Sequence, residues 1–213
     1  MRLFIHIPKN GGMTVRRGLS DKIVLASKEN HVSSEYSRCV LKVMTAAGEH
    51  HGFEHARIVD VSHKLRESLR AFALIRNPWA RTVSRYTFAR HIGDKAGQQS
   101  FREFLDERFI YGGRPYYWHR GVRGWYEQRC YVLDEHGDLA VDCLRLESDD
   151  LRRYFNLSQS PRRRNVSNTE HLDYREFYGN EEYDIVKDWY AGDIEFFGFD
   201  FDGPATQNIW KPE

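Results

Sequence analysis

The chain has 213 residues, which suits a single α/β domain with a small excursion. Apolar residues make up 40% and charged residues 30%, a balance typical of a soluble globular protein rather than a disordered one. The net charge of only +1 excludes a global field that draws the protein to nucleic acid, so any basic patch must be local.

The distribution of cysteine, histidine and apolar residues indicates the compartment of the protein and bears on metal binding and membrane insertion. The three cysteines are scattered without a CxxC pair, which favours a reducing compartment and structural thiols. Ten histidines occur without an HExxH motif or a Cys/His cluster, so we expect no metal site. No leader peptide precedes the first predicted strand, and no run of about 18 apolar residues follows, so we expect a cytoplasmic protein without a membrane partner.

The N-terminal segment predicts a strand, a turn and a helix. Residues 3–7 form a mostly apolar run typical of a buried parallel strand, and Pro8 ends it because proline cannot donate to a sheet. Lys9 and two glycines follow, and a helix can open at Met13. Such a turn offers backbone N–H groups, the helix dipole and a lysine to an anion. The alternative is an ordinary connection between a strand and a helix.

Strands and helices then alternate along the chain. We expect a strand at 22–26, a helix from Ser34 to Gly48, a helical run at 58–69 and a strand at 71–75. The last strand leads directly into Arg76, at the edge where α/β folds bind ligands. Pro78 suits the start of a helix, and Ser84 lies about two helical turns beyond Arg76. A phosphate held by a guanidinium and a hydroxyl explains this arrangement, although a single arginine after a strand is usually a surface residue.

The segment from 91 to 126 is rich in glycine and loops, apart from a short amphipathic helix at 100–108. Basic and aromatic residues are interleaved in it, which suits stacking on a sugar or ring and pairing with an anionic acceptor. A lid packed on the core would show the same pattern. The candidate acceptor contacts are Arg114, Tyr117, His119 and Arg120.

The C-terminal third predicts a late strand and helices. We expect a strand or helix at 129–133, a turn at 134–138, a strand at 139–146, and then a helix that begins with acidic residues. Residues 160–168 form the most basic loop, which in most proteins is only a solvated charge run. A long helix is expected from 174 to 190, with Phe177, Tyr178, Val186 and Tyr190 toward the core.

Two of these segments resemble the signatures of the sulfotransferases that use 3′-phosphoadenosine 5′-phosphosulfate (PAPS). Residues 8–14, PKNGGMT, are similar to the 5′-phosphosulfate loop, whose usual bacterial form is PKTGGTS. The lysine precedes the glycines, so the segment does not fit the Walker A loop. Residues 76–86 match the 3′-phosphate signature RNPxxRxxSxY, and 193–199 resembles the closing DFxxFGY. The resemblance covers nearly the whole chain. Asn10 and Met13 differ from the family's usual loop, which often has threonine at both positions.

The resemblance implies a P-loop-NTPase-like three-layer α/β sandwich with a central, mainly parallel sheet, formed by one domain over 1–213 with an excursion at about 91–126. It implies PAPS as the donor, 3′-phosphoadenosine 5′-phosphate (PAP) as the product, and no metal. The residues that it assigns to the donor are Lys9, Asn10, Gly11, Gly12, Met13, Thr14, Val15, Arg76, Ser84, Arg164, Asn165 and Ser167.

The family also carries a histidine base after its second strand. Glu54-His55-Ala56 resembles one form of that motif and His51-Gly52 half-resembles another, so we expect His55 as the base and His51 as the alternative. Lys9 would stabilise the leaving phosphate. We expect the acceptor to be a small molecule or a glycan. Two other functions stay open: a small-molecule kinase, which would need a lysine after the glycines, and a non-catalytic relative that binds an anionic glycan.

Overall fold

The computed structural model describes the whole chain except residues 28–31, 48–52, 120, 163–172 and 213. One parallel sheet of four strands lies at its centre, in the order β2-β1-β3-β4. The strands are β1 (Arg2–Ile5), β2 (Ile23–Leu25), β3 (Ala71–Ile75) and β4 (Asp142–Arg145). The expected α/β class is therefore confirmed. Because β1 and β3 are parallel neighbours, their carboxyl ends lie side by side.

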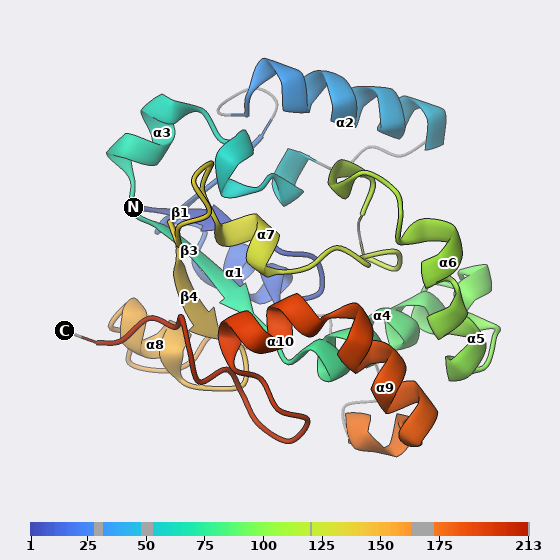
Figure 1. Ribbon diagram of the computed structural model, residues 1–213. Coiled ribbons are helices and arrows are strands. Elements are labelled where there is room, and N and C mark those ends of the chain that lie inside the picture. Colours follow the sequence, from blue (N-terminus) through green and yellow to red (C-terminus); the bar gives the residue numbers. More distant parts are fainter. Residues whose placement is uncertain (28–31, 48–52, 120, 163–172, 213) are drawn as a thin grey trace.

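Helices surround this sheet (Figure 1). The α-helices are α1 (Gly12–Gly18), α2 (Ser34–Ala47), α3 (His63–Ser68), α4 (Pro78–His91), α5 (Phe101–Asp106), α6 (Arg108–Tyr111), α7 (Arg129–Val132), α8 (Asp150–Tyr154), α9 (Asn180–Trp189) and α10 (Ala191–Phe197). The 3-10 helices are η1 (Phe53–His55), η2 (Ile58–Asp60), η3 (Lys95–Gly97), η4 (Tyr116–Trp118) and η5 (Tyr174–Phe177). Within the described residues, no helix has both the length and the apolar character needed to span a bilayer.

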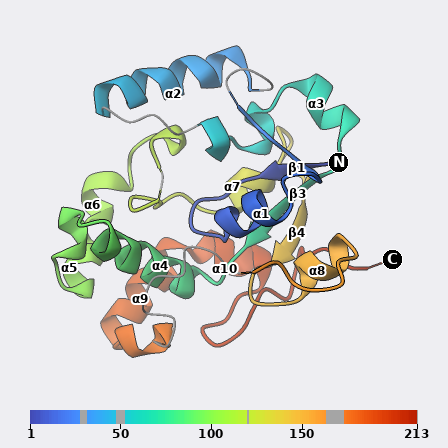
Figure 2. The same cartoon turned by 180° about the vertical axis from the view of Figure 1, so that it is seen from behind.

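Helices cover both faces of the sheet because successive strand residues point to opposite sides. On one face, α1 and α8 share a cluster with the strands, composed of Phe4, Val15, Leu19, Phe72, Leu74, Leu144 and Leu151. On the other face, Leu3, Ile5 and Ala73 pack with residues of α2, α7 and α10. Figure 1 shows α7 and α10 in front of the sheet. Figure 2 is the opposite view, in which α1 and α8 lie in front of the sheet.

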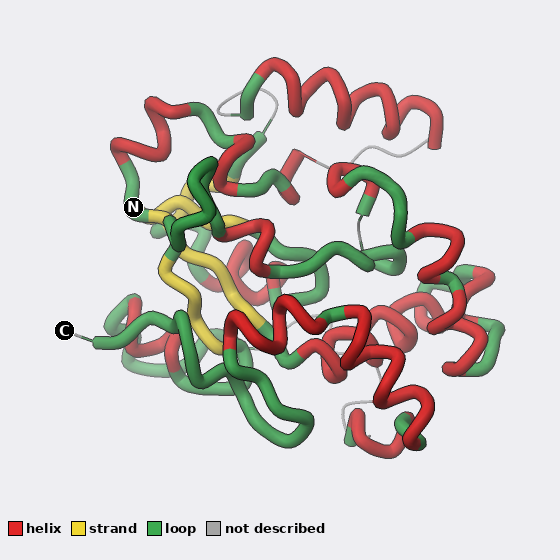
Figure 3. The backbone as a smooth tube through the Cα atoms, in the orientation of Figure 1, coloured by secondary structure: helices red, strands yellow, loops and turns green. Residues whose placement is uncertain are grey.

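A third apolar cluster lies beyond the sheet and is rich in aromatic side chains. It joins α4, α5 and α9, and its larger members are Trp79, Tyr86, Phe101, Phe104, Trp125 and Tyr190. Figure 3 shows short helices joined by loops in this part of the molecule. The excursion expected at 91–126 therefore contains helices that share a core with α4 and α9.

Some predicted elements are interrupted. The helical run expected at 58–69 is divided into η2 and α3, because Val61 pairs with Val32 in a β-bridge. The late strand is shorter than 139–146, since Leu139 pairs with Leu133 across the preceding turn. The helix expected at 174–190 is broken at Gly179, whose N–H donates to Glu182 Oε2 (3.0 Å) and starts α9.

The sheet face beneath α8 provides a test of the core. Leu144 in β4 is fully buried, so Leu144→Ala removes packed methyl groups and leaves a cavity. We expect the free energy of unfolding, measured by urea denaturation, to fall by about 2–5 kcal/mol. Leu139→Ala is the matched control, because Leu139 is 40% exposed, and should change it by less than about 0.5 kcal/mol. Equal losses in the two variants would contradict this description of the core.

Candidate functional site

The turn after β1 is tight and depends on its glycines. Lys9 and Gly11 both have positive φ, at 67° and 76°, and a lysine rarely takes this conformation. Gly12 packs directly against His6, and a Cβ at position 12 would lie 1.8 Å from His6 Nε2. The N-cap of α1 is Gly11, which has no side chain to cap the helix, and the first N–H groups of a helix have no partner within it. The turn therefore presents backbone N–H groups beside Lys9.

Two arginines from the second signature hold the carbonyl groups of this turn. Arg76 Nη1 donates to the Lys9 carbonyl (3.2 Å), and Arg81 Nε donates to the Pro8 carbonyl (3.2 Å). Arg76 directly follows β3, the neighbour of β1 in the sheet, which brings its side chain to the turn. The two segments that the sequence predicts to bind anions are far apart in the sequence but in contact in the structure.

The start of α4 positions both arginines. Asn77 is the N-cap: its side-chain oxygen accepts from the N–H groups of Trp79 (3.0 Å) and Ala80 (3.3 Å), and Pro78 occupies the first helical position. The Asn77 amide also donates to the Asp200 carbonyl (2.8 Å). The helix therefore begins where the sequence predicts, directly after Arg76.

Lys9 lies in a strongly cationic environment. Its Nζ is 3.8 Å from the centre of the Phe88 ring. Burial lowers the pKa of Lys9 to about 7, with further contributions from the positive charges of Arg76 and Arg85. Arg85 is fully buried, stacks on Trp125 and donates to the Gly124 carbonyl (2.7 Å).

Several N–H groups of these arginines have no acceptor among the described residues. Arg81 Nη2 and both Nε and Nη2 of Arg85 are buried and make no hydrogen bond. Buried donors without an acceptor destabilise the protein by about 1–3 kcal/mol each. The arrangement of Lys9, Arg76, Arg81 and Arg85 therefore suits a ligand that brings negative charge.

Gln128 links the turn to the second signature. Its Oε1 accepts from Asn10 Nδ2 (2.6 Å) and from the Arg76 N–H (3.0 Å), while its Nε2 donates to the Arg76 carbonyl (2.8 Å). Asp193 in α10 accepts from the Gln128 N–H (2.8 Å), which holds Gln128 in turn. Burial raises the pKa of Asp193 to about 6. A buried polar network thus connects β1, β3, α7 and α10.

His55 lies against the end of β1. Its Nδ1 donates to the His6 carbonyl (2.9 Å), and its Nε2 is 3.8 Å from Glu54 Oε1. With the hydrogen on Nδ1, Nε2 carries the lone pair of the neutral ring and can accept a proton. The rings of His6 and His55 have centroids 4.4 Å apart. Burial, followed by the charges of His55 and Arg16, lowers the pKa of His6 well below its usual value.

The other residues predicted to contact PAPS differ in their burial. Asn10 is buried, with its N–H bonded to the Ile7 carbonyl (3.4 Å) and its amide to Gln128, so it supports the turn from within. The prediction that Val15 contacts PAPS is corrected for its side chain, which lies in the apolar cluster beneath α1. Thr14 is buried, whereas Met13 and Ser84 are half-buried. The predicted residues His51, Arg120, Arg164, Asn165 and Ser167 lie outside the described part of the chain.

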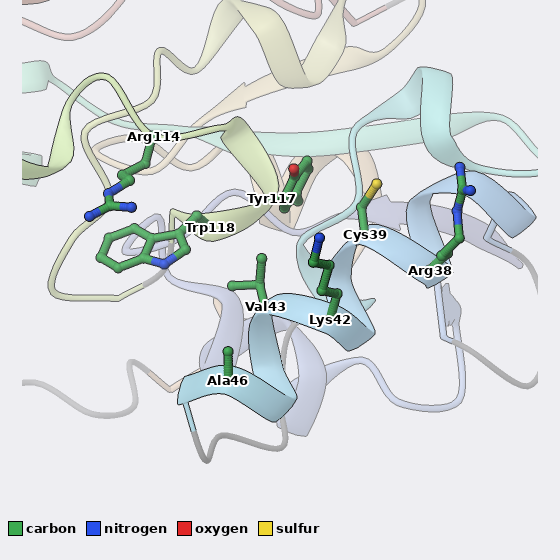
Figure 4. Close-up of a pocket in the computed structure, with 8 residues that line it drawn as sticks. All are labelled: Arg38, Cys39, Lys42, Val43, Ala46, Arg114, Tyr117 and Trp118. Carbon is green, nitrogen blue, oxygen red and sulfur yellow. The ribbon is translucent and has the colours of Figure 1, made fainter.

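Two of the predicted acceptor contacts line a cavity of about 500 Å³ between α2 and η4 (Figure 4). Arg114 and Trp118 lie next to each other on one wall, and residues of α2 form the other. The lining residues are Arg38, Cys39, Lys42, Val43, Ala46, Arg114, Tyr117 and Trp118. Two aromatic residues and three basic residues therefore line one cavity.

His119 does not have the predicted role. It is 1% exposed, its Nε2 donates to the Arg114 carbonyl (3.0 Å), and its Nδ1 accepts from the Trp125 N–H (3.0 Å). Burial lowers its pKa. His119 therefore holds its own loop together and does not contact an acceptor, because both ring nitrogens are already bonded to backbone groups.

Four residues of the site were not identified from the sequence. Arg81 and Arg85 carry a signal that could have revealed them, because they lie one helical turn apart in the helix that follows Arg76. Gln128 and Asp193 carry none, since their roles exist only through contacts with distant segments.

Comparisons with known proteins give limited information. No protein-family model matches the chain. A stretch of 51 residues is 43% identical to an uncharacterized protein of Archaeoglobus fulgidus, and this match covers 24% of the chain and 42% of that protein. No solved structure matches.

The pKa of Lys9 can be measured by NMR on a lysine-labelled sample, with Lys9→Met to assign the signal. We expect a titration midpoint near 7. Arg76→Gln removes a neighbouring positive charge, so the midpoint should rise toward the usual value of 10.5. Arg152→Gln, an exposed arginine in α8, should not move it. A wild-type midpoint near 10, or no rise in Arg76→Gln, would show that Lys9 lies outside this cationic group.

Proposed function

We propose that the chain is a sulfotransferase that moves a sulfuryl group from PAPS to a hydroxyl group, on a P-loop-like α/β fold. The observation that carries the proposal is the hydrogen bond from Arg76 to the Lys9 carbonyl, together with that from Arg81 to the Pro8 carbonyl. A doubly phosphorylated nucleotide needs two anion sites within its own length, and these bonds bring the two candidate segments into contact.

The donor fits the charge of this site. Lys9 and the N–H groups at the start of α1 would hold the 5′-phosphosulfate, and Arg76 with Ser84 would hold the 3′-phosphate. PAPS carries negative charge at both ends, which would be attracted to the positive charges gathered around Lys9. It would also favour the charged form of Lys9.

The residues of the site can perform the transfer. His55 Nε2 would take the proton of the acceptor hydroxyl, while the hydroxyl oxygen forms a bond to sulfur and the bond from sulfur to the 5′-phosphate oxygen breaks. The negative charge then passes to the departing phosphate, where the Lys9 ammonium would stabilise it. The hydrogen bond from His55 Nδ1 to the His6 carbonyl supports this role, because it orients the ring and keeps the lone pair on Nε2.

The cavity between α2 and η4 supports an anionic, ring-containing acceptor, such as an acidic glycan. Arg38, Lys42 and Arg114 would pair with carboxylate or sulfate groups, and Tyr117 and Trp118 offer faces for a sugar ring. The same cavity favours the second candidate function, a non-catalytic relative that binds such a glycan. A cytoplasmic location is also a proposal, supported by three cysteines that are all free.

The nucleotide assignment is tested by calorimetric titration with PAP and by transfer of labelled sulfate from PAPS to a panel of acidic glycans. We expect Arg76→Ala to weaken PAP binding by about 10- to 150-fold, the range for loss of a charged hydrogen bond. His55→Ala should bind PAP normally but lose about 10²- to 10⁴-fold in turnover.

Lys95→Ala serves as the control for loss of a lysine in another part of the chain, and it should change neither binding nor turnover. Binding of ATP in place of PAP, with metal-dependent hydrolysis, would favour a kinase. Glycan binding without any transfer would favour the non-catalytic relative. Either result would overturn the proposal.

The affinity for PAP should depend on pH through Lys9. Its pKa is about 7 in the free protein, and a bound phosphate would raise it, so binding takes up a proton above pH 7. The affinity should therefore fall by up to about tenfold per unit as the pH rises from 7 to 9. Calorimetry in buffers of different ionisation enthalpy measures this proton uptake. In Lys9→Met, PAP binding should lose this dependence. Its persistence there would assign the proton to another group.

A further inference from the structure

Three potential metal ligands lie together beside the turn after β1. They are His6, which directly follows β1, and Glu54 and His55, which belong to η1. Each offers one nitrogen or oxygen atom, and these atoms all lie within 4.8 Å of one another. The Nε2 of His55 and the Oε1 of Glu54 are 3.8 Å apart. The fold therefore brings two imidazoles and one carboxylate, from segments separated in the sequence, to a single point.

The surrounding contacts orient two of these ligands. His55 donates its Nδ1–H to the His6 carbonyl (2.9 Å), which directs Nε2 toward Glu54. Arg16 pairs with Glu54 Oε2 (2.9 Å), so that Oε1 is the oxygen nearer to His55. Histidines that bind metals usually donate their second N–H to a backbone carbonyl or a carboxylate, and their carboxylate partners are themselves hydrogen-bonded. Both arrangements are present here.

His6 provides an independent observation. It is 7% exposed, and its Nδ1 is buried with no hydrogen-bond partner among the described residues. A buried polar atom without a partner is unfavourable, and most such atoms in proteins have one. The close packing of Gly12 against the ring keeps His6 in place. The pair of His6 and His55 thus contains an unsatisfied nitrogen that a bound cation could use.

We propose that His6, Glu54 and His55 form a binding site for a transition-metal dication, with Zn²⁺ as the best-suited ion. Two histidines and one glutamate are a common ligand set for zinc with a fourth, open position. Zinc-bound atoms in a tetrahedral site lie about 3.3 Å apart, given bonds of about 2.0–2.1 Å. Nε2 of His55 and Oε1 of Glu54 at 3.8 Å need only a small approach to reach that separation.

The site would regulate the chemistry that we propose for His55, and this consequence rests on the proposed function. A lone pair on Nε2 can bind zinc or accept the proton of an acceptor hydroxyl, but it cannot do both. Bound zinc would therefore inhibit sulfuryl transfer, and a chelator would restore it. Binding of zinc itself does not depend on the proposed function.

The test titrates Zn²⁺ alone into the protein in competition with a chromophoric chelator, and uses the absorption spectrum of the Co²⁺ form to report the ligand geometry. We expect one equivalent of metal in the wild type, with a spectrum typical of tetrahedral nitrogen and oxygen ligands. Loss of a residue that only hydrogen-bonds to a metal ligand weakens metal binding by about 10- to 100-fold. Glu54→Gln and His55→Ala change the ligands themselves, so each should weaken metal binding at least that much.

His63→Ala is the matched control. His63 pairs with Glu67 (3.1 Å) in α3, but both side chains are strongly exposed, so its loss should leave the affinity unchanged. Circular dichroism on each variant verifies the fold, and the buried His6 is left intact. Wild-type affinity in both Glu54→Gln and His55→Ala would overturn the proposal, and so would loss of binding in His63→Ala.

The zinc result and the sulfotransferase result are separable. Zinc binding without PAP binding would leave the metal site standing and remove its regulatory role. Sulfuryl transfer from PAPS that zinc does not inhibit, together with zinc binding that survives in Glu54→Gln and His55→Ala, would overturn the metal site alone.

Discussion

The hydrogen bond from Arg76 to the Lys9 carbonyl is the contact on which the site depends. It exists because β1 and β3 are parallel neighbours, so that the residues following each strand emerge at the same edge of the sheet. Gln128 reinforces it by bonding to Asn10 and to both backbone groups of Arg76. This network helps to hold Lys9 in a backbone conformation that lysine seldom adopts, and it brings the Lys9 ammonium into the cationic group.

Like charges gathered in this way oppose folding, and aromatic rings and backbone carbonyls offset part of the cost. Arg85 stacks on Trp125 and bonds to a carbonyl, Lys9 lies over Phe88, and backbone oxygens of Pro8 and Lys9 take up two guanidinium groups. Burial, followed by the positive charges of Arg76 and Arg85, lowers the pKa of Lys9, and an anionic ligand would raise it again.

One histidine serves two chemistries in these proposals. The bond from His55 Nδ1 to the His6 carbonyl fixes a single tautomer and directs Nε2 toward Glu54. That lone pair suits a general base and a metal ligand equally, since both need an unprotonated nitrogen in a fixed direction. His6, buried beneath Gly12, connects the ring to the turn that carries Lys9. Acid–base chemistry and metal binding would therefore compete at one atom.

The sequence by itself determined the local features: the strand at 71–75, the start of α4 at Pro78, and the turn at Lys9 to Gly12. Apolar runs, a capping asparagine and glycines encode these within a few residues. Only the tertiary structure decided the partners of Gln128, the burial of His119 and the meeting of His6 with Glu54 and His55. Such contacts join segments whose spacing carries no pattern, because chain topology and not periodicity brings them together. The helix expected at 174–190 is divided for a local reason, since the N–H of Gly179 bonds to Glu182 and starts α9 at Asn180.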